Sequence, residues 1–251
     1  MGGKPISKFV KDNRNVKAVI FDLDDTLFDH RYSCRKGLAA LRRKYKCFRQ
    51  ITLDEFESEH RRILDEIHLT QLLTGRISLT EARKERFRRA FERVGEKADD
   101  AKCNEAIKIY RTYYEKNRRA VPGASQLLYK LKPLVKIAIV SNNLFSEQTG
   151  KLIDIGLQKY VDILVVSEHA GVTKPETAIF LETLKRLKCT ANEAVMIGDS
   201  WEIDIAGALN SGIRAVWFNR YRQKIKDTKG VKQFYSYKPL DRVLKIIFNK
   251  G

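Results

Sequence analysis

The sequence predicts an α/β protein with a doubly wound parallel sheet and one inserted, all-helical domain. Short, continuously apolar segments alternate with amphipathic helix patterns along most of the 251 residues, as is typical of parallel strands buried on both faces. The alternation is interrupted once, between residues 31 and 119, where only helix patterns occur. We therefore expect a core formed by residues 1–30 and 120–251, with residues 31–119 as the insert.

Five apolar segments have strand length and are bounded by Gly or polar residues. They are Lys17–Asp22, Val135–Ser141, Val161–Val166, Ala194–Asp199 and Ile213–Phe218. Helix patterns separate the later strands at Phe145–Ile155, Glu176–Leu187 and Glu202–Leu209. Residues beyond Asn219 fit no motif, and there we expect an edge strand at Tyr235–Tyr237 and a final helix at Asp241–Phe248.

The insert has the pattern of a helical bundle. Two segments of the form Ser/Thr-x-x-Glu, beginning at Thr52 and Ser78, are typical of helix N-termini. One apolar stripe with helical spacing is formed by Phe87, Ala90, Phe91 and Val94. We expect a bundle of about four helices, since a stripe of this width must pack against neighbouring helices.

Composition limits the class of protein. Hydrophobic residues make up 43% of the chain, enough to bury a core, and no apolar run approaches the length of about 18 residues that a membrane span needs. The polar start of the chain lacks a signal-peptide pattern, and the cysteines lie too far apart to suggest a zinc site or a disulfide framework. We expect a soluble, cytoplasmic protein that has no membrane partner.

The net charge of +18 is unusual, with basic residues concentrated in the insert and between Arg220 and Lys232. Such charge attracts nucleic acid, anionic membranes or phosphorylated substrates, and a solvated surface with no partner explains it equally well. No nucleic-acid-reading motif is present, so a nucleic-acid-associated protein is kept only as an alternative.

Acidic side chains follow two of the predicted strands. Asp22 and Asp24 stand two residues apart at the end of the first strand, so both can project to the same side. Asp199 ends another strand, and Asp204 follows five residues later. The carboxyl ends of parallel strands meet at one edge of a sheet, where clustered carboxylates repel each other unless a cation binds among them. An all-oxygen site of this kind suits Mg²⁺.

Two further strand ends carry groups that complement the acids. Ser141 ends the second strand, and its hydroxyl and nearby backbone N–H groups can hold a phosphate. Lys174 lies between a strand and the next helix, and Pro175 fixes it just ahead of that helix. Taken alone, Ser141 is better explained as a helix N-cap and Lys174 as a surface lysine.

Together, the four segments resemble the haloacid dehalogenase-like (HAD) superfamily. The Asp-x-Asp-x-Thr segment at 22–26 matches its first motif, Ser141 its second, Lys174 its third and Gly-Asp-x-x-x-x-Asp at 198–204 its fourth. The resemblance covers Lys17–Phe218 and implies a Rossmann-like core with a helical C1-type cap. The segment Gly-Val-Thr-Lys-Pro-Glu at 171–176 is similar to sequences of the branch that contains pyrimidine nucleotidases and N-acylneuraminate 9-phosphatase.

The resemblance also implies a role for each matching residue. Asp22 would be the nucleophile, Asp24 the general acid/base, and Thr26 a brace for the first-motif loop. Asp25 matches no motif position, and we expect it to be solvated. The resemblance implies that the phosphoryl group is bound by Ser141, the Asn142 backbone and Lys174. It implies that Mg²⁺ is bound by the carboxylate of Asp22, the carbonyl of Asp24 and Asp199, with Asp204 supporting the metal site.

The chemistry of phosphate ester hydrolysis explains this set of groups. A carboxylate can take up a phosphoryl group as an aspartyl phosphate, and the leaving alkoxide needs a proton from an acid such as Asp24. A halide needs no proton, so Asp24 favours a phosphatase over a dehalogenase. We expect a Mg²⁺-dependent phosphomonoester hydrolase acting on a small phosphorylated metabolite, such as a nucleoside monophosphate or a sugar phosphate. A phosphotransferase or mutase of the same superfamily stays open as an alternative.

Overall fold

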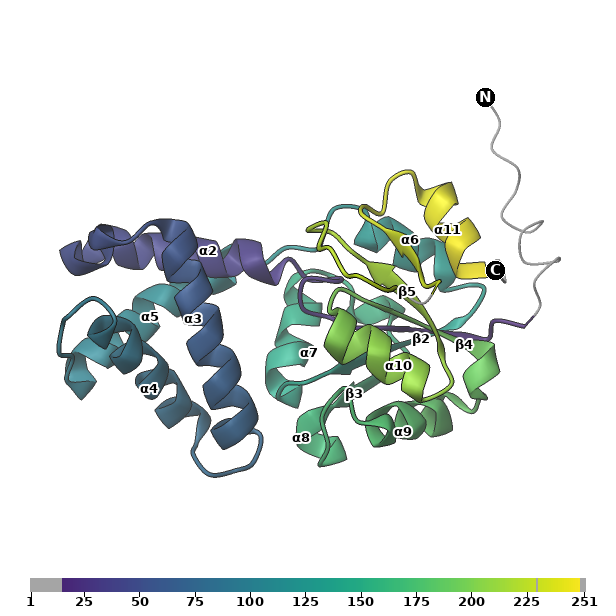
Figure 1. The fold of residues 1–251 in the computed structure, drawn as a ribbon, viewed down its shortest axis with the longest axis horizontal. Helices are drawn as coiled ribbons and strands as arrows, with labels where there is room; N and C mark the ends of the chain where they lie inside the picture. Colours follow the sequence, from purple (N-terminus) through teal and green to yellow (C-terminus); the bar gives the residue numbers. More distant parts are fainter. Residues whose placement is uncertain (1–14, 229, 249–251) are drawn as a thin grey trace. The chain divides into compact units, whose positions relative to one another are not determined.

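The computed structural model describes residues 15–228 and 230–248, and the chain divides into two compact units (Figure 1). The core unit contains the chain up to Phe28 and from Ala120 onward, and the helical unit contains Asp29–Arg119. Among the described residues, no helix is both long enough and apolar enough to cross a membrane.

The core unit is built on one six-stranded sheet in which all paired neighbours are parallel. Its strand order is β3-β2-β1-β4-β5-β6, so the order reverses between β1 and β4. The strands are β1 (Ala18–Phe21), β2 (Lys136–Ser141), β3 (Ile163–Val166), β4 (Ala194–Gly198), β5 (Arg214–Phe218) and β6 (Lys232–Phe234). The predicted doubly wound, Rossmann-like α/β core is confirmed.

Helices cover both faces of the sheet, which explains why its strands are continuously apolar. Figure 1 shows α6 (Ala124–Leu131) and α11 (Leu240–Phe248) on one side of the sheet and α9 (Thr177–Leu187) on the other. Along β1, Ala18 and Ile20 join the cluster packed around α9 and α10 (Ala206–Asn210), whereas the alternate residues project to the opposite face. The described part of this unit also contains α7 (Phe145–Asp154), α8 (Ser167–Ala170) and the short turns η3 (Gln158–Tyr160) and η4 (Ala191–Glu193).

Two expectations about the core unit are wrong in detail. The sixth strand is Lys232–Phe234 rather than Tyr235–Tyr237, because Tyr237 turns inward and is fully buried against the Phe218 and Phe234 rings. The segment expected as one helix at Glu202–Leu209 begins instead with a π-helical turn, η5 (Trp201–Ile205), which continues into α10.

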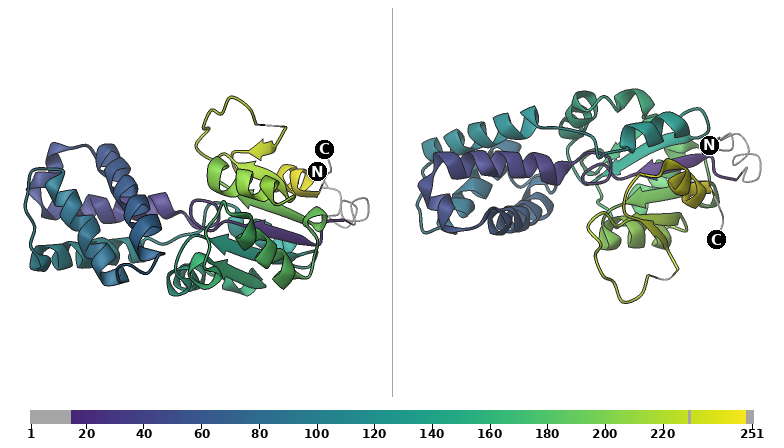
Figure 2. Two further views of the ribbon diagram at one scale, coloured as in Figure 1. Left: turned by 60° about the horizontal axis from the view of Figure 1, so that its bottom comes forward. Right: turned by 90° about the horizontal axis from the view of Figure 1, so that it is seen from above.

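The helical unit contains four main helices and two short turns, which Figure 2 shows from two further sides. Thr52 and Ser78 both form the expected capping boxes, so each satisfies backbone N–H groups at a helix start. Gly37 allows close packing, since a Cβ there would lie 2.6 Å from the Tyr110 ring. The elements are α2 (His30–Lys44), η1 (Lys46–Gln50), α3 (Leu53–Ile67), η2 (His68–Leu72), α4 (Leu79–Glu92) and α5 (Asp100–Lys116).

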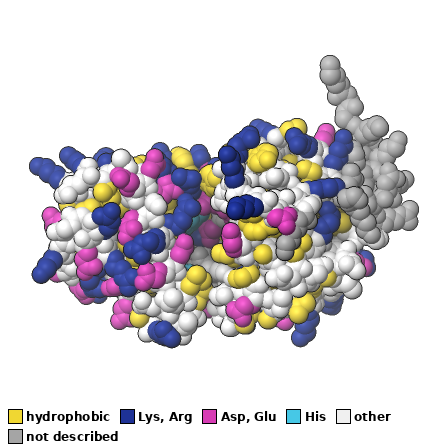
Figure 3. Space-filling model, in the orientation of Figure 1, with side chains coloured by type: hydrophobic (Ala, Val, Ile, Leu, Met, Phe, Trp, Pro, Cys, Tyr) yellow, Lys and Arg dark blue, Asp and Glu magenta, His cyan; other side chains and the backbone are white. Residues whose placement is uncertain are grey.

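Many basic side chains of the helical unit form ion pairs with acids of the same unit. On the face drawn in Figure 3, Lys and Arg side chains are interspersed with Asp and Glu. Buried Glu57 contacts three arginines, and surface pairs extend the pattern across α3, α4 and α5. Examples of those surface pairs are Arg89–Glu66 at 2.7 Å, Lys84–Asp100 at 2.7 Å and Arg88–Asp100 at 2.9 Å.

Candidate active site

The candidate site lies at the carboxyl ends of β1 and β4, the two adjacent strands at which the strand order reverses. Open α/β sheets bind ligands at such a point, because the connections diverge there and leave a crevice. Asp22 directly follows β1, and its backbone N–H donates to the carbonyl of Ile197 at 2.9 Å. Asp199 directly follows β4. Both acids are therefore held by the central ladder of the sheet.

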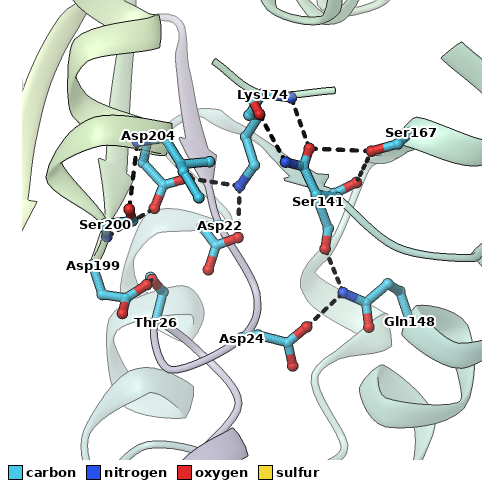
Figure 4. A network of polar contacts seen from close by, with 12 residues as sticks. Asp22, Asp24, Thr26, Ser141, Gln148, Ser167, Lys174, Asp199, Ser200 and Asp204 are labelled. Carbon is cyan, nitrogen blue, oxygen red and sulfur yellow. Dashed lines mark hydrogen bonds and ion pairs between the residues drawn. The ribbon is translucent and has the colours of Figure 1, made fainter. Parts of the chain in front are cut away.

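Three carboxylates come together here, and we call Asp22, Asp199 and Asp204 the acidic cluster (Figure 4). One oxygen from each lies within 4.8 Å of the others. Gly198 makes this possible, since a Cβ at that position would lie 2.3 Å from Oδ2 of Asp204. A second contact holds Asp204 in place, because its Oδ2 accepts a hydrogen bond from the backbone N–H of Ser200 at 3.1 Å.

A single lysine neutralises part of this charge. Lys174 is buried, and its Nζ donates to Oδ1 of Asp22 at 2.7 Å and to Oδ1 of Asp204 at 2.6 Å. The acidic cluster thus carries three carboxylates against one ammonium group when all are ionised. Buried charges are stable only when they are paired, so this site is one cation or more short of balance.

The pKa values reflect the same imbalance. Burial raises the pKa of Asp22 to about 7; Lys174 opposes that rise, while Asp204 and Asp24 add to it. Burial and the neighbouring Asp22 also raise the pKa of Asp199. Burial works against the charge of Lys174, but Asp204 and Asp22 outweigh it and raise the pKa of that ammonium group. Lys174 is therefore a permanent cation, and the carboxylates compete for it.

The backbone of Lys174 is fixed by the side chain of Asn142. The Oδ1 atom of Asn142 accepts from the backbone N–H of Lys174 at 2.7 Å, and its Nδ2 donates to the carbonyl of Lys174 at 2.8 Å. Ser167 donates to both the Ser141 carbonyl and Asn142 Oδ1, which joins the ends of β2 and β3. The sequence predicts a role for the backbone of Asn142 at the phosphate, whereas the contacts to Lys174 are made by the Asn142 side chain.

The carboxylate of Asp24 lies outside the acidic cluster and makes contacts of its own. It accepts from Nζ of Lys151 and from Nε2 of Gln148, both on α7. Gln148 also donates to Oγ of Ser141, so the two residues expected at the substrate are joined through one amide (Figure 4). Ser141 is the last residue of β2 and does not cap α7, whose N-cap residue is Leu144.

Thr26 and Asp25 complete the loop after β1. Thr26 is fully buried; its Oγ1 donates to Oδ1 of Asp199 at 3.4 Å, and its carbonyl accepts from the Tyr237 hydroxyl at 3.0 Å. The expected solvation of Asp25 is only partial. Asp25 is half-buried and accepts a hydrogen bond from Tyr221 at 3.4 Å, because the segment after β5 passes beside this loop.

Three polar residues of the site carry no motif signal in the sequence: Gln148, Lys151 and Ser167. Gln148 and Lys151 are three positions apart and therefore lie on one face of α7. A lysine on the helix that follows the second motif would indicate a site residue if its face of the helix were known to be buried. The sequence alone does not show which face of that helix is buried.

Comparison with known proteins decides the family. A sequence model of the haloacid dehalogenase-like hydrolases matches residues 16–212. The chain belongs to this family. It is 33% identical to the ribulose-1,5-bisphosphate 5-phosphatase of Halopiger xanaduensis over 80% of this chain and 84% of that protein. It is 28% identical to the pyrimidine 5'-nucleotidase YjjG of Escherichia coli over 82% of this chain and 87% of that protein.

A solved structure with a similar fold belongs to an enzyme that is not a phosphatase. The L-2-haloacid dehalogenase of Xanthobacter autotrophicus has a TM-score of 0.72 and 19% identity, over 92% of this chain and 98% of that chain. At this identity the likeness concerns the fold alone. The curated relatives named above are phosphatases, so the prediction that this HAD protein is a phosphatase rather than a dehalogenase is confirmed.

Proposed function

We propose that this HAD phosphatase is a Mg²⁺-dependent phosphomonoester hydrolase that forms an aspartyl phosphate on Asp22. One observation carries the proposal: a nucleophilic carboxylate at the end of β1 lies among two further acids and is paired with one buried lysine. This arrangement has the cationic partner that a phosphoryl group needs, and enough carboxylate oxygens for a metal ion.

The residues present fit a divalent cation of hard character. Asp22, Asp199 and Asp204 offer oxygen atoms close enough to share one ion, and burial, with a smaller contribution from their mutual repulsion, raises the pKa of Asp22 and Asp199. The carbonyl of Asp24 would be a further ligand, as the family pattern implies. A bound Mg²⁺ would offset negative charge on the phosphoryl oxygens and allow two anions to approach each other.

The reaction then divides between residues of the core unit. An oxygen of Asp22 attacks phosphorus, and the bond between phosphorus and the ester oxygen breaks as Asp24 gives that oxygen a proton. Asp24, now a carboxylate, takes a proton from the water that attacks the aspartyl phosphate, which releases phosphate and restores Asp22. Lys174 and the Ser141 hydroxyl would bind the phosphoryl oxygens throughout.

We propose a small phosphorylated metabolite as the substrate, in the class of sugar phosphates and nucleoside monophosphates. The two relatives named above act on a sugar bisphosphate and on pyrimidine nucleotides, respectively. The basic composition of the chain suits a substrate that carries one phosphate or more.

Phosphate release from p-nitrophenyl phosphate and from a panel of sugar phosphates and nucleotides, with Mg²⁺ and with EDTA, tests this proposal. We expect turnover with Mg²⁺ and its loss in EDTA, with recovery when Mg²⁺ is restored. Turnover that is unchanged in EDTA would contradict the role of the metal. No phosphate release from any member of the panel would contradict the proposed substrate class.

A further inference from the structure

Asp24 has an ionic partner on α7 that the reaction described above does not use. Lys151 is 3% exposed, and its Nζ donates to Oδ1 of Asp24 at 2.6 Å and to Oδ2 at 2.8 Å. The same Nζ lies 5.3 Å from the centre of the Phe28 ring, so an apolar wall closes one side of the ion pair. Contacts to both oxygens fix the rotation of the carboxylate as well as its position.

Gln148 connects this pair to the expected phosphate site. It is fully buried; its Nε2 donates to Oδ2 of Asp24 at 2.9 Å and to Oγ of Ser141 (Figure 4). One rigid amide therefore sets the separation between the Asp24 carboxylate and the Ser141 hydroxyl. Because Ser141 Oγ is the acceptor in that contact, its own hydrogen remains available for an oxygen of the substrate.

We propose that Lys151 and Gln148 are positioning residues, which hold the Asp24 carboxylate at a fixed distance from the phosphoryl-binding Ser141. The inference rests on the proposed function, since it assumes that Asp24 transfers the proton. Neither α7 side chain is expected to touch the substrate. Lys151 acts through Asp24 alone, whereas Gln148 acts through Asp24 and Ser141.

The location of this pair favours positioning over a purely structural role. Even a fully buried ion pair adds little net stability compared with apolar packing, and this pair is only partly buried, so stability alone is a weak explanation for a lysine at this place. Proton transfer, in contrast, depends strongly on geometry, and a displacement of about 1 Å can cost about 100-fold in rate. Holding one carboxylate with three hydrogen bonds meets that demand for geometric control.

Steady-state kinetics of Lys151→Met with p-nitrophenyl phosphate and an alkyl phosphate tests the inference. We expect kcat to fall roughly 10- to 100-fold while KM changes less than about threefold, because Lys151 does not bind the substrate. Lys151→Arg keeps a cation with several donors and should recover part of the loss. Gln148→Leu should lower kcat and also raise KM, because it disturbs Ser141 as well.

The decisive comparison repeats Lys151→Met in an Asp24→Asn background. If Lys151 acts through Asp24, the second substitution should lower kcat less than about twofold once Asp24 is gone. A structural role predicts the same loss in both backgrounds. The double variant also avoids leaving Asp24 without its partner, so it is informative even if Lys151→Met alone folds poorly.

Thr149→Val is the matched control on the same helix. The Thr149 hydroxyl is buried without a hydrogen-bond partner among the described residues, so its removal should leave kcat, KM and the melting temperature near wild type. Equal losses from Lys151→Met in both backgrounds, or none in the wild type, would overturn the positioning role. An Asp24→Asn protein with wild-type kcat on the alkyl phosphate would instead overturn the proposed function itself.

Discussion

Two buried lysines stand at the same end of the sheet, and they have different surroundings. Lys174 pairs with Asp22 and Asp204, while the nearby Asp199 adds a third carboxylate. Lys151 pairs with the one carboxylate of Asp24. The first group carries excess negative charge, and the second is balanced. The difference indicates where a further cation is needed and where it is not.

The contrast also separates two tasks. At Lys174, burial and the neighbouring carboxylates together raise the pKa of Asp22 and Asp199, which favours the binding of any cation that stabilises their charged forms. At Lys151, hydrogen bonds from Lys151 and Gln148 fix one carboxylate in space. One sheet edge thus combines a site for binding charge with a site for directing a proton.

The largest expected effect comes from Asp22→Asn, which removes the nucleophile from the acidic cluster. We expect kcat to fall by at least about 1,000-fold, since the two-step path through the aspartyl phosphate is lost. Asp25→Asn is the matched control, because Asp25 is a variable position within the motif and lies outside the acidic cluster, and its kcat should stay within about threefold of wild type. Phosphate release measures kcat of both variants. Similar losses of kcat in the two variants would contradict a specific role of Asp22 as the nucleophile.

Replacing Lys174 or Lys151 by Met should lower the free energy of unfolding by different amounts. Lys174→Met leaves two buried carboxylates without their partner, and we expect a loss of about 3–5 kcal/mol in the free energy of unfolding. Lys151→Met should cost less, because the Asp24 side chain is 27% exposed and can be hydrated. Denaturant unfolding measures both values. An equal cost would show that the charge imbalance at Lys174 has no energetic consequence.

Magnesium should stabilise the protein through the acidic cluster. At a concentration about 100 times its dissociation constant, a ligand that binds only the folded state adds about 2.7 kcal/mol to the free energy of unfolding. Thermal unfolding with Mg²⁺ and with EDTA measures this gain, which Asp199→Asn should reduce. Asp25→Asn should keep the full gain, and an equal gain in Asp199→Asn would place the metal elsewhere.

The last expected effect concerns pH. The pKa of Asp22 is about 7 in the folded protein, against an ordinary value of 3.8, so the folded state binds more protons than the unfolded chain between these values. In EDTA, the contribution of Asp22 to stability is present below its unfolded pKa and is lost as pH rises through about 7. The difference in unfolding free energy between wild type and Asp22→Asn isolates this group. A difference that does not change between about pH 4 and pH 7 would contradict the raised pKa.

The strands and the acids at their ends are predictable from the sequence because their signals are local. Asp22 and Asp199 each follow a continuously apolar segment, and parallel strands bring such ends together. Lys151 and Gln148 are not predictable in this way, since their role depends on which face of α7 packs toward β1. Tyr237 gives no local signal either: its inward turn shifts the edge strand, and no apolar run predicts that.

The most direct test of the central claim uses Asp24→Asn protein with p-nitrophenyl phosphate and Mg²⁺. The nitrophenolate leaves without a proton, whereas hydrolysis of the aspartyl phosphate still needs the base. We predict a burst of one equivalent of nitrophenol, followed by slow turnover, with the phosphoryl group found by mass spectrometry on the peptide that contains Asp22. Steady turnover without a burst, or a phosphoryl group on any other residue, would contradict the account.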